Sequence, residues 1–242
     1  HGIANRPHIK THKLPQIARL QLAAGAAGMN CQKLGEAEAM ADAGIEDILV
    51  TFNILGTAKL ERLAALCRRA RISVTADSPV VARGLSQIAQ KHGLEIEVLV
   101  EFDTGMGRCG VQTPAAAAEL GELIHRAEGL RLGGLMTYPM NDDSDPFVRQ
   151  TRERLAGAGI ALARVSYGGT PCMWQAHTRR ELTEYRAGTY VYGDRATVRS
   201  GAQSRLDCAL RVFAPVVSRP TAGRGIIDAG SKSGRRLMIW PN

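Results

Sequence analysis

The chain has 242 residues, of which 45% are hydrophobic and 22% are charged, and its formal net charge is +8. This length can bury a sizeable core, and the composition excludes both a disordered chain and a fibrous repeat. We find neither an apolar run of membrane-spanning length nor a signal segment, which predicts a cytoplasmic protein without membrane contact. Five widely spaced cysteines without a C-x-x-C pair favour reduced thiols over a disulfide or zinc framework.

The excess of basic residues raises the question of a nucleic-acid partner. The arginines are scattered through presumed helices, for example at Arg68, Arg69 and Arg71, and aromatic residues do not alternate with them as a stacking platform requires. Solvated helix faces explain this pattern better, and an anionic small-molecule ligand would also use part of the charge. We therefore expect no nucleic-acid partner.

Strand-like runs alternate with helical stretches through the first part of the chain. The runs are 28–31, 47–52, 72–76, 97–102, 132–138, 163–167 and 184–187, and residues 7–9 resemble the end of an eighth strand. Helical spacing is clear at 59–70, 80–92 and 114–127. Strands that alternate with helices predict parallel pairing through right-handed crossovers. Eight such units predict an α/β fold of the (β/α)8 TIM-barrel type, with a doubly wound open sheet as the alternative.

Capping residues mark several helix ends. Ser78 and Thr113 each precede a proline, which is the pattern of a cap followed by proline in the first turn. Gly93 stands where the helix at 80–92 should end. These signals support the helical assignments.

The character of the chain changes after about residue 200. Residues 206–217 and 225–229 are strand-like with no helix between them, which predicts the start of a β-type domain. Some forty residues are too few to close the core of such a domain. We therefore predict a barrel at 1–200, followed by the beginning of a truncated β domain at 201–242.

Functional groups in a parallel barrel gather at the carboxyl ends of the strands. Two Gly-Thr segments stand at the last two of these ends, Gly168-Gly169-Thr170 and Gly188-Thr189. Their unhindered N–H groups and hydroxyls suit a phosphate, although a tight loop is the plain alternative for each. We predict that they converge on one anion site.

Lys10 stands at the end of a presumed buried strand, among the cationic neighbours Arg6, Lys13 and His12. Burial and nearby positive charge both favour the neutral form of its amine. A neutral amine is what a Schiff base with an aldehyde cofactor requires.

A family resemblance runs along nearly the whole chain. It rests on RPHIKTHKLPQIARLQLAAGAAGMNCQKLGEAEAMADAGIEDILV (6–50), VLVEFDTGMGRCGV (98–111), GLMTYP (134–139), SYGGTP (166–171), TEYRAGTYVYGDR (183–195) and RGIIDAGSKS (224–233). With these motifs in this order, the chain resembles the D-threonine aldolase / D-serine dehydratase family. These are fold-type III pyridoxal 5'-phosphate enzymes, related to the amino-terminal barrel of alanine racemase.

The resemblance implies a role for several residues. Lys10 would be the Schiff-base lysine, Arg108 would lie near the phenolic oxygen of the cofactor, and Tyr138 would pack on its pyridine ring. Two further segments would complete the cofactor site. At the end of the 163–167 strand they are Tyr167, Gly168, Gly169 and Thr170, and after the 184–187 strand they are Gly188 and Thr189. Candidates for substrate contact are His12, Gln32 and His177.

Arg186 is a departure from part of the family. It occupies the position from which alanine racemases address the pyridine nitrogen with a guanidinium, whereas some aldolases have an uncharged residue there. A permanently cationic donor leaves that nitrogen unprotonated, which weakens the ring as an electron sink. Arg186 therefore favours racemase-like chemistry more than an uncharged residue would.

The resemblance also implies features that this chain does not contain. The aldolases and D-serine dehydratases carry a divalent-metal site, a His with a Cys or Asp two residues on, far towards the carboxyl terminus, and no such residue follows Lys232. We therefore predict no metal ligand here and expect Mn²⁺ or Zn²⁺ only in a full-length member. The family also has a strand and a helix before the lysine, which we expect to be missing from the barrel.

The implied reaction is retro-aldol cleavage of a D-3-hydroxy-amino acid, such as D-threonine, to glycine and an aldehyde. Three alternatives stay open: elimination of water from D-serine, racemisation of an amino acid, and a non-catalytic barrel that only binds pyridoxal 5'-phosphate. The expected partner is a small D-amino acid, and the full-length protein is expected to be a homodimer.

Overall fold

The computed structural model of the chain describes residues 1–230, and within them eight parallel strands form one sheet. The strands are β1 (Ala4–Asn5), β2 (Met29–Cys31), β3 (Asp47–Val50), β4 (Arg71–Ala76), β5 (Ile96–Glu101), β6 (Leu130–Thr137), β7 (Arg164–Gly168) and β8 (Glu184–Arg186). Their order in the sheet is β1-β8-β7-β6-β5-β4-β3-β2, so neighbours in sequence are neighbours in space.

Backbone hydrogen bonds join the two ends of this sheet. The N–H of Asn30 donates to the carbonyl of Pro7, and the N–H of Ala27 donates to the carbonyl of Asn5, each at 2.8 Å. The sheet is therefore closed, and the predicted (β/α)8 barrel is confirmed.

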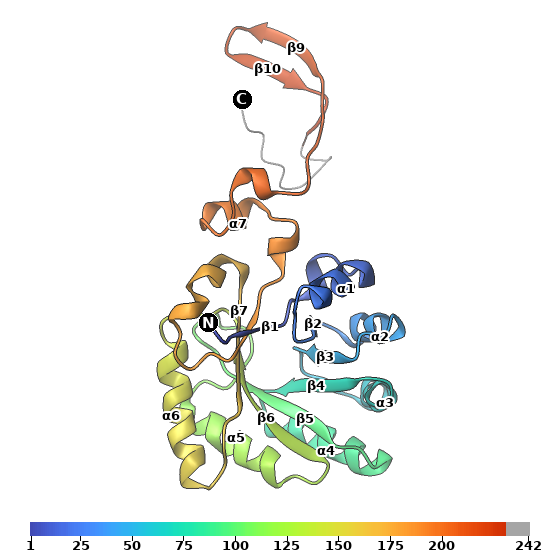
Figure 1. Ribbon diagram of the computed structural model, residues 1–242, viewed down its shortest axis with the longest axis vertical. Coiled ribbons are helices and arrows are strands. Elements are labelled where there is room, and N and C mark those ends of the chain that lie inside the picture. The colour runs from blue at the N-terminus through green and yellow to red at the C-terminus, as the bar shows by residue number, and fades with distance from the viewer. Residues whose placement is uncertain (231–242) are drawn as a thin grey trace.

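Helices form the outer layer around the strands (Figure 1). They are α1 (Pro15–Ala23), α2 (Leu34–Asp42), α3 (Thr57–Cys67), α4 (Pro79–His92), α5 (Pro114–Arg126) and α6 (Ser144–Gly157). The seventh crossover is the 3-10 helix η2 (Thr170–Thr178), and η3 (Thr189–Val191) and α7 (Arg195–Arg199) follow β8. Through residue 230, no helix has the length and apolar character needed to cross a membrane.

Two of the three predicted capping residues, Thr113 and Gly93, act as caps in the structure. The Thr113 hydroxyl accepts the N–H of Ala116 at 3.1 Å, and Gly93 ends α4 in the left-handed conformation, at a φ of 62°. Ser78 precedes α4 but makes no hydrogen bond to it through its side chain.

The strands pack side chains on both of their faces. Outward residues such as Val50, Val98 and Val100 join the large core between sheet and helices, while Leu49, Leu99 and Met136 form a separate small cluster. Because neighbouring residues of a strand point to opposite faces, this second cluster lies inside the barrel. Polar side chains fill much of the remaining interior, and they are fully or almost fully buried: Asn30, Ser73, Thr75, Glu101, Ser166, Glu184 and Arg186.

Ion pairs close the amino end of the barrel. Arg6 follows β1 and lies between Asp47 at the start of β3 and Glu184 at the start of β8, with both N–O distances at 2.7 Å. Glu97 of β5 pairs with Arg131 and Arg164 from the two strands that follow. This end is therefore sealed by charge pairing, and open space for a ligand lies at the opposite end.

Two strand predictions were wrong. Residues 7–9 are not a strand: β1 lies earlier, His8 forms only an isolated bridge to Asn30, and Ile9–Thr11 is the 3-10 turn η1. Backbone pairing towards β8 continues, because the N–H of His8 donates to the carbonyl of Ala187 at 2.8 Å, but Pro7 has no N–H to donate on the side that faces β2. Lys10 therefore lies in a turn after the strand.

The second error concerns residues 206–217. The Ser204 N–H donates to the Asp207 carboxylate at 2.8 Å, and this capping box holds the short 3-10 turn η4 (Arg205–Asp207) in place of a strand. The observed strands are β9 (Val216–Thr221) and β10 (Arg224–Ile227), which pair antiparallel and lie well beyond the barrel and α7 (Figure 1). Residues 231–242 of the predicted second domain lie outside the described residues.

Candidate active site

A pocket opens at the carboxyl end of the barrel. It is enclosed by the turns and loops that follow β1, β2, β3, β5, β6, β7 and β8. Its lining residues are His8, Lys10, Gln32, Thr51, Arg108, Met136, Tyr138, Gly169, Thr170, Pro171, Arg186, Gly188 and Thr189. This is the end at which parallel barrels place their functional groups.

Lys10 enters this pocket from the turn η1. Partial burial lowers the pKa of its amine, and the positive charges of Arg108 and Arg186 lower it further against the opposing effect of Glu36. The predicted direction is therefore right, but two of the predicted causes are not. Arg6 is held by ion pairs at the other end of the barrel, and Lys13 pairs with Glu36 at 3.3 Å.

Tyr138 presents its ring to two cations. The Lys10 Nζ lies 5.4 Å from the ring centroid, and the Arg108 Cζ lies 5.1 Å from it. Arg108 also contacts the buried carboxylate of Glu101, with Nη2 3.4 Å from Oε1. The three residues predicted to be catalytic thus lie around one aromatic face.

Cys109 is next to Arg108 but is not activated. Burial and the nearby Glu101 carboxylate raise the pKa of its thiol to about 11. The thiol donates to Oε1 of Glu101 at 3.1 Å and stays protonated near neutral pH.

The two Gly-Thr segments lie side by side. The Thr170 hydroxyl oxygen accepts the N–H of Gly188 at 3.2 Å and the N–H of Thr189 at 2.9 Å. A side chain at Gly188 would place its Cβ 2.7 Å from the carbonyl oxygen of His8, so the close approach of these backbones requires glycine. The predicted convergence is present; that the segments bind an anion stays a prediction.

Arg186 lies at the floor of the pocket and is buried. Its Nε donates to the Ser166 hydroxyl at 2.8 Å, Nη1 donates to the Asn30 side-chain oxygen at 3.2 Å, and Nη2 donates to the carbonyls of Thr137 and Ser166. One N–H, on Nη1, has no partner among residues 1–230. Burial lowers the pKa of Arg186 to about 10, with a smaller contribution from the Arg108 charge, so the guanidinium stays positive near neutral pH.

Four of the predicted site residues do not line the pocket. Tyr167 points to the outer layer, where its hydroxyl donates to Asp145 at 3.0 Å, and Gly168 packs beneath the Arg186 guanidinium. The His12 ring is buried and accepts the backbone N–H of Leu14 at 3.1 Å. His177 is exposed and stacks on His1 with ring centroids 5.0 Å apart. Gln32, in contrast, does line the pocket.

Four lining residues were not anticipated: His8, Thr51, Met136 and Pro171. Thr51 follows β3 directly, so its position at the carboxyl end of a strand is the signal that marks it. His8 has the subtler signal of standing two residues before Lys10 on a chain predicted to be extended. Within residues 1–230, we find no group of three or more His, Cys, Asp and Glu side chains that could hold a metal ion.

Comparison with known proteins places this geometry in a family. The family described as "Alanine racemase, N-terminal domain" matches residues 4–196. D-threonine aldolase of Arthrobacter sp is 36% identical over 96% of this chain and 66% of its own length. D-threo-3-hydroxyaspartate dehydratase of Delftia sp. (strain HT23) is 32% identical over 95% of this chain and 64% of its own length.

A solved structure agrees with these matches. D-threonine aldolase from Filomicrobium marinum superposes with a TM-score of 0.83 at 34% identity, covering 96% of this chain and 67% of that protein. The chain spans about two thirds of the length of the relatives it matches. The match over residues 4–196, together with the closed barrel, establishes that the chain belongs to the family of the alanine racemase N-terminal domain.

Proposed function

We propose that the pocket binds pyridoxal 5'-phosphate and that the chain forms the barrel part of a lyase that cleaves D-3-hydroxy-amino acids to glycine and an aldehyde. The observation that supports this most directly is the placement of Lys10. Its amine, with a lowered pKa, shares one pocket with the two converging Gly-Thr segments.

The side chains of the pocket fit this cofactor chemically. Lys10, Arg108 and Arg186 bring positive charge to the lining, and in the part of the chain that the structure describes no carboxylate lines the pocket. The hydroxyls of Thr170 and Thr189 and the backbone N–H of Thr170 suit a phosphate, while the Tyr138 ring offers a flat face. An anionic aromatic aldehyde matches this set of groups.

When bound, pyridoxal 5'-phosphate supplies an aldehyde that condenses with amines and a conjugated ring that withdraws electrons from the α-carbon of an amino acid. Lys10 would hold the aldehyde through its Nζ, since its lowered pKa increases the share of uncharged amine near neutral pH. Arg186 would offer its unpartnered N–H at the pocket floor. Thr170, Gly188 and Thr189 would hold the phosphate.

Lys10 is also the best-placed group for moving a proton. Burial, with the charges of Lys10 and Arg186, lowers the pKa of His8 to about 3, so the imidazole is a weak base near neutral pH. The amine of Lys10 would be available in the pocket to accept and return a proton at the substrate.

Elimination is the second candidate reaction. The similarity to a dehydratase supports it, and retro-aldol cleavage and elimination differ in which bond at the substrate breaks. Racemisation is a third, supported by the guanidinium of Arg186 in the pocket. The divalent metal of the family and the homodimer stay predictions.

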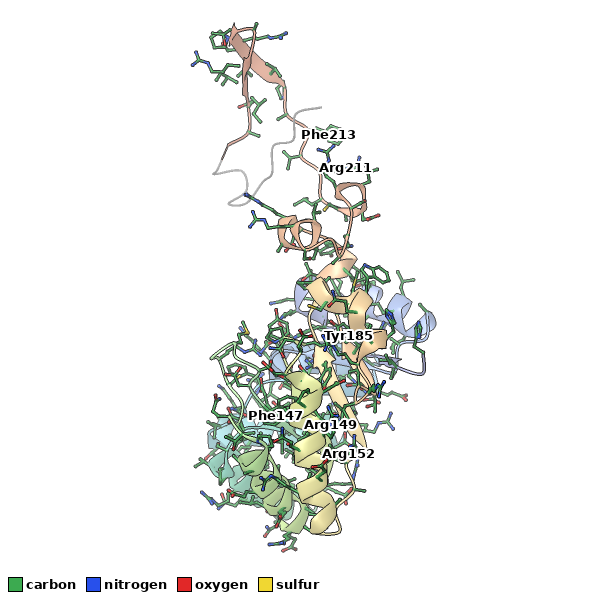
Figure 2. All side chains as sticks on the ribbon, turned by 90° about the vertical axis from the view of Figure 1, so that its left-hand side faces the viewer. Phe147, Arg149, Arg152, Tyr185, Arg211 and Phe213 are labelled. Carbon is green, nitrogen blue, oxygen red and sulfur yellow. The ribbon has the colours of Figure 1, made fainter. Side chains whose placement is uncertain are left out.

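We also propose that the chain from residue 201 onward begins a separate β unit. Its support is the β9–β10 hairpin, which lies outside the barrel sheet, and the apolar side chains exposed before it, Leu206, Leu210 and Phe213. Figure 2 shows Phe213 and Arg211 on this extension, away from the barrel residues Phe147 and Tyr185. A cytoplasmic location is supported by the five cysteines, all of which are unpaired.

A product screen tests the proposed reaction. The protein, loaded with pyridoxal 5'-phosphate, is given D-threonine, D-serine and D-alanine in separate assays, with and without Mn²⁺ or Zn²⁺. We expect acetaldehyde and glycine from D-threonine, none from L-threonine, and none from the Lys10→Ala variant. Keto acid as the main product would instead favour the dehydratase, and racemised alanine alone would favour the racemase.

A further inference from the structure

His8 lies beside Lys10 in the pocket, and its ring has a defined hydrogen-bond partner on each nitrogen. Nδ1 is 3.3 Å from the backbone nitrogen of Lys10, and Nε2 is 3.2 Å from the side-chain oxygen of Gln32. The ring is almost fully buried, at 5% exposure. Neither contact involves a side chain that we assign to the cofactor, because the contact with Lys10 is made by its backbone N–H.

The Thr51 carbonyl and the Lys10 backbone N–H fix which atoms donate in these hydrogen bonds. The Thr51 carbonyl can only accept, so the Gln32 group that lies 3.2 Å from it is the NH2 group. Gln32 therefore turns its oxygen to His8, which must donate from Nε2. At the other end, the backbone N–H of Lys10 can only donate, so Nδ1 is the unprotonated nitrogen. The neutral tautomer with its proton on Nε2 therefore satisfies both hydrogen bonds of the His8 ring.

We propose that His8 and Gln32 are positioning residues for Lys10: Gln32 fixes the His8 imidazole with its proton on Nε2, and Nδ1 then holds the turn from which the Lys10 amine enters the pocket. The proposal rests on the proposed function only in taking Lys10 as the residue that binds the cofactor.

The turn η1 needs such support. It is a three-residue 3-10 turn, held otherwise by the N–H groups of His12 and Lys13 on the carbonyl of Ile9. Isolated 3-10 turns have poor hydrogen-bond geometry. Gln32 is itself anchored, because its backbone N–H donates to the Glu36 carboxylate at 2.8 Å. The chain of contacts thus connects η1 to β3 and α2.

Burial and positive charges near the His8 ring keep the imidazole neutral. Burial lowers the pKa of His8 to about 3, with the charges of Lys10 and Arg186 next in importance, and the hydrogen bonds to Gln32 and to the Asn30 backbone act in the opposite direction. An imidazolium would carry a proton on Nδ1 and could not accept the N–H of Lys10. The neutral ring therefore keeps its positioning contact throughout the physiological pH range.

Nitrogen-15 NMR of His8 in the unliganded protein tests the tautomer directly. We expect the Nε2–H form, without titration between about pH 5 and pH 8. The Gln32→Glu variant should place a carboxylate beside Nε2, favour the imidazolium and bring the titration of His8 into that range. Gln87→Glu, on the exposed surface of α4, makes the same substitution elsewhere and should leave His8 unchanged.

Capture of pyridoxal 5'-phosphate, followed by absorbance, tests the positioning role. His8→Phe keeps a ring but no acceptor and should slow capture about tenfold, the equivalent of one lost hydrogen bond. His8→Asn should recover most of the rate, since an asparagine can accept the N–H two residues on.

An Nδ1–H tautomer in the native protein, or capture by His8→Phe at the native rate, would overturn the proposal. Retained capture by Lys10→Ala would instead contradict the proposed function, and the NMR result would still decide the role of His8.

Discussion

The amine of Lys10 is reactive to the extent that its neighbours keep it uncharged. Partial burial lowers its pKa first, and Arg108 and Arg186 add to the effect through their charge. Arg108 is the more accessible of the two, with 37% of its side chain exposed, and its contact with the buried Glu101 carboxylate is long at 3.4 Å, so it is the better of the two to replace. Lys10 and Arg108 therefore form a testable electrostatic pair.

Replacing Arg108 by Gln should raise the pKa of Lys10, because a cation that opposes protonation is removed. At neutral pH a smaller fraction of the amine is then uncharged, so capture of pyridoxal 5'-phosphate slows, and the native rate returns at higher pH. A stopped-flow profile of capture rate against pH measures the shift of the midpoint. Arg83→Gln on the exposed face of α4 is the control, and coincident profiles for Arg108→Gln and the native protein would refute this coupling.

The sequence predicts the identity of the pocket residues Lys10, Arg108 and Tyr138 because a family motif surrounds each of them. It does not predict which cations act on Lys10. Arg6 and Lys13 are close in sequence but pair with carboxylates elsewhere, whereas Arg108 and Arg186 reach Lys10 only through the closure of the barrel.

The hydroxyl of Thr170 joins the turn after β7 to the turn after β8. Replacing Thr170 by Val should leave the N–H groups of Gly188 and Thr189 without this acceptor and weaken binding of pyridoxal 5'-phosphate about tenfold. Binding of pyridoxal, which lacks the phosphate, should change much less. Titration of both compounds by absorbance gives the comparison, with Thr170→Ser as the variant that keeps the hydroxyl. Equal losses for the two compounds would argue against a phosphate site here.

Helices α4 and α5 both begin with a hydroxyl residue followed by proline, but their caps differ. Thr113→Ala should lower the free energy of unfolding by about 1 kcal/mol, since the hydroxyl caps α5. Ser78→Ala should cost less than half as much, because Ser78 makes no such bond to α4. Urea denaturation of both variants measures the difference. Equal costs would show that the two caps are equivalent in solution.

The elements themselves are largely predictable, because most strands and helices of the barrel follow from apolar periodicity and from Pro and Gly at their ends. The two errors have local causes that the pattern does not contain, namely a proline at Pro7 and a side-chain contact at Ser204. At residues 206–217, β-branched and apolar residues suggest a strand, but the Ser204–Asp207 capping box forms a turn. Such a contact depends on geometry that periodicity does not contain.

The barrel as a whole is closed at its amino end by Arg6. This residue joins the segment after β1 to β3 and β8 through Asp47 and Glu184, and both Arg6 and Glu184 are about 4% exposed in their side chains. Burial alone would raise the pKa of Asp47, but hydrogen bonds and charge from Arg6 and Arg71 outweigh it, and the pKa is lowered. The ionised form of Asp47 therefore stabilises the folded barrel at neutral pH.

Arg6→Met should lower the free energy of unfolding at neutral pH by about 3–5 kcal/mol, because two carboxylates lose their buried partner. A carboxyl whose pKa is lowered by folding stabilises above its unfolded pKa, and this contribution is lost as the pH falls below about 4. The difference between native protein and variant should therefore narrow in acid.

Urea denaturation at several pH values measures this difference. Arg131→Met, at the same end but 53% exposed in its side chain, should cost less than about 1 kcal/mol. A cost for Arg6→Met as small as that of Arg131→Met would contradict the role of Arg6 in closing the barrel.

The barrel, its pocket end and its family follow from the sequence, whereas the path of the chain beyond the barrel does not. The polar interior was also missed: Arg186 contacts Ser166 on the neighbouring strand and Asn30 on β2, far away in sequence, and no periodic pattern marks these contacts.

We propose above all that Lys10 binds the aldehyde of pyridoxal 5'-phosphate at the carboxyl end of this barrel. Reduction of the loaded protein with borohydride, followed by digestion and mass spectrometry, tests it most directly. The predicted result is one modified peptide, containing Lys10, which persists in Lys13→Ala and is lost in Lys10→Ala. Modification of another lysine in the native protein, or an undiminished adduct in Lys10→Ala, would contradict the claim.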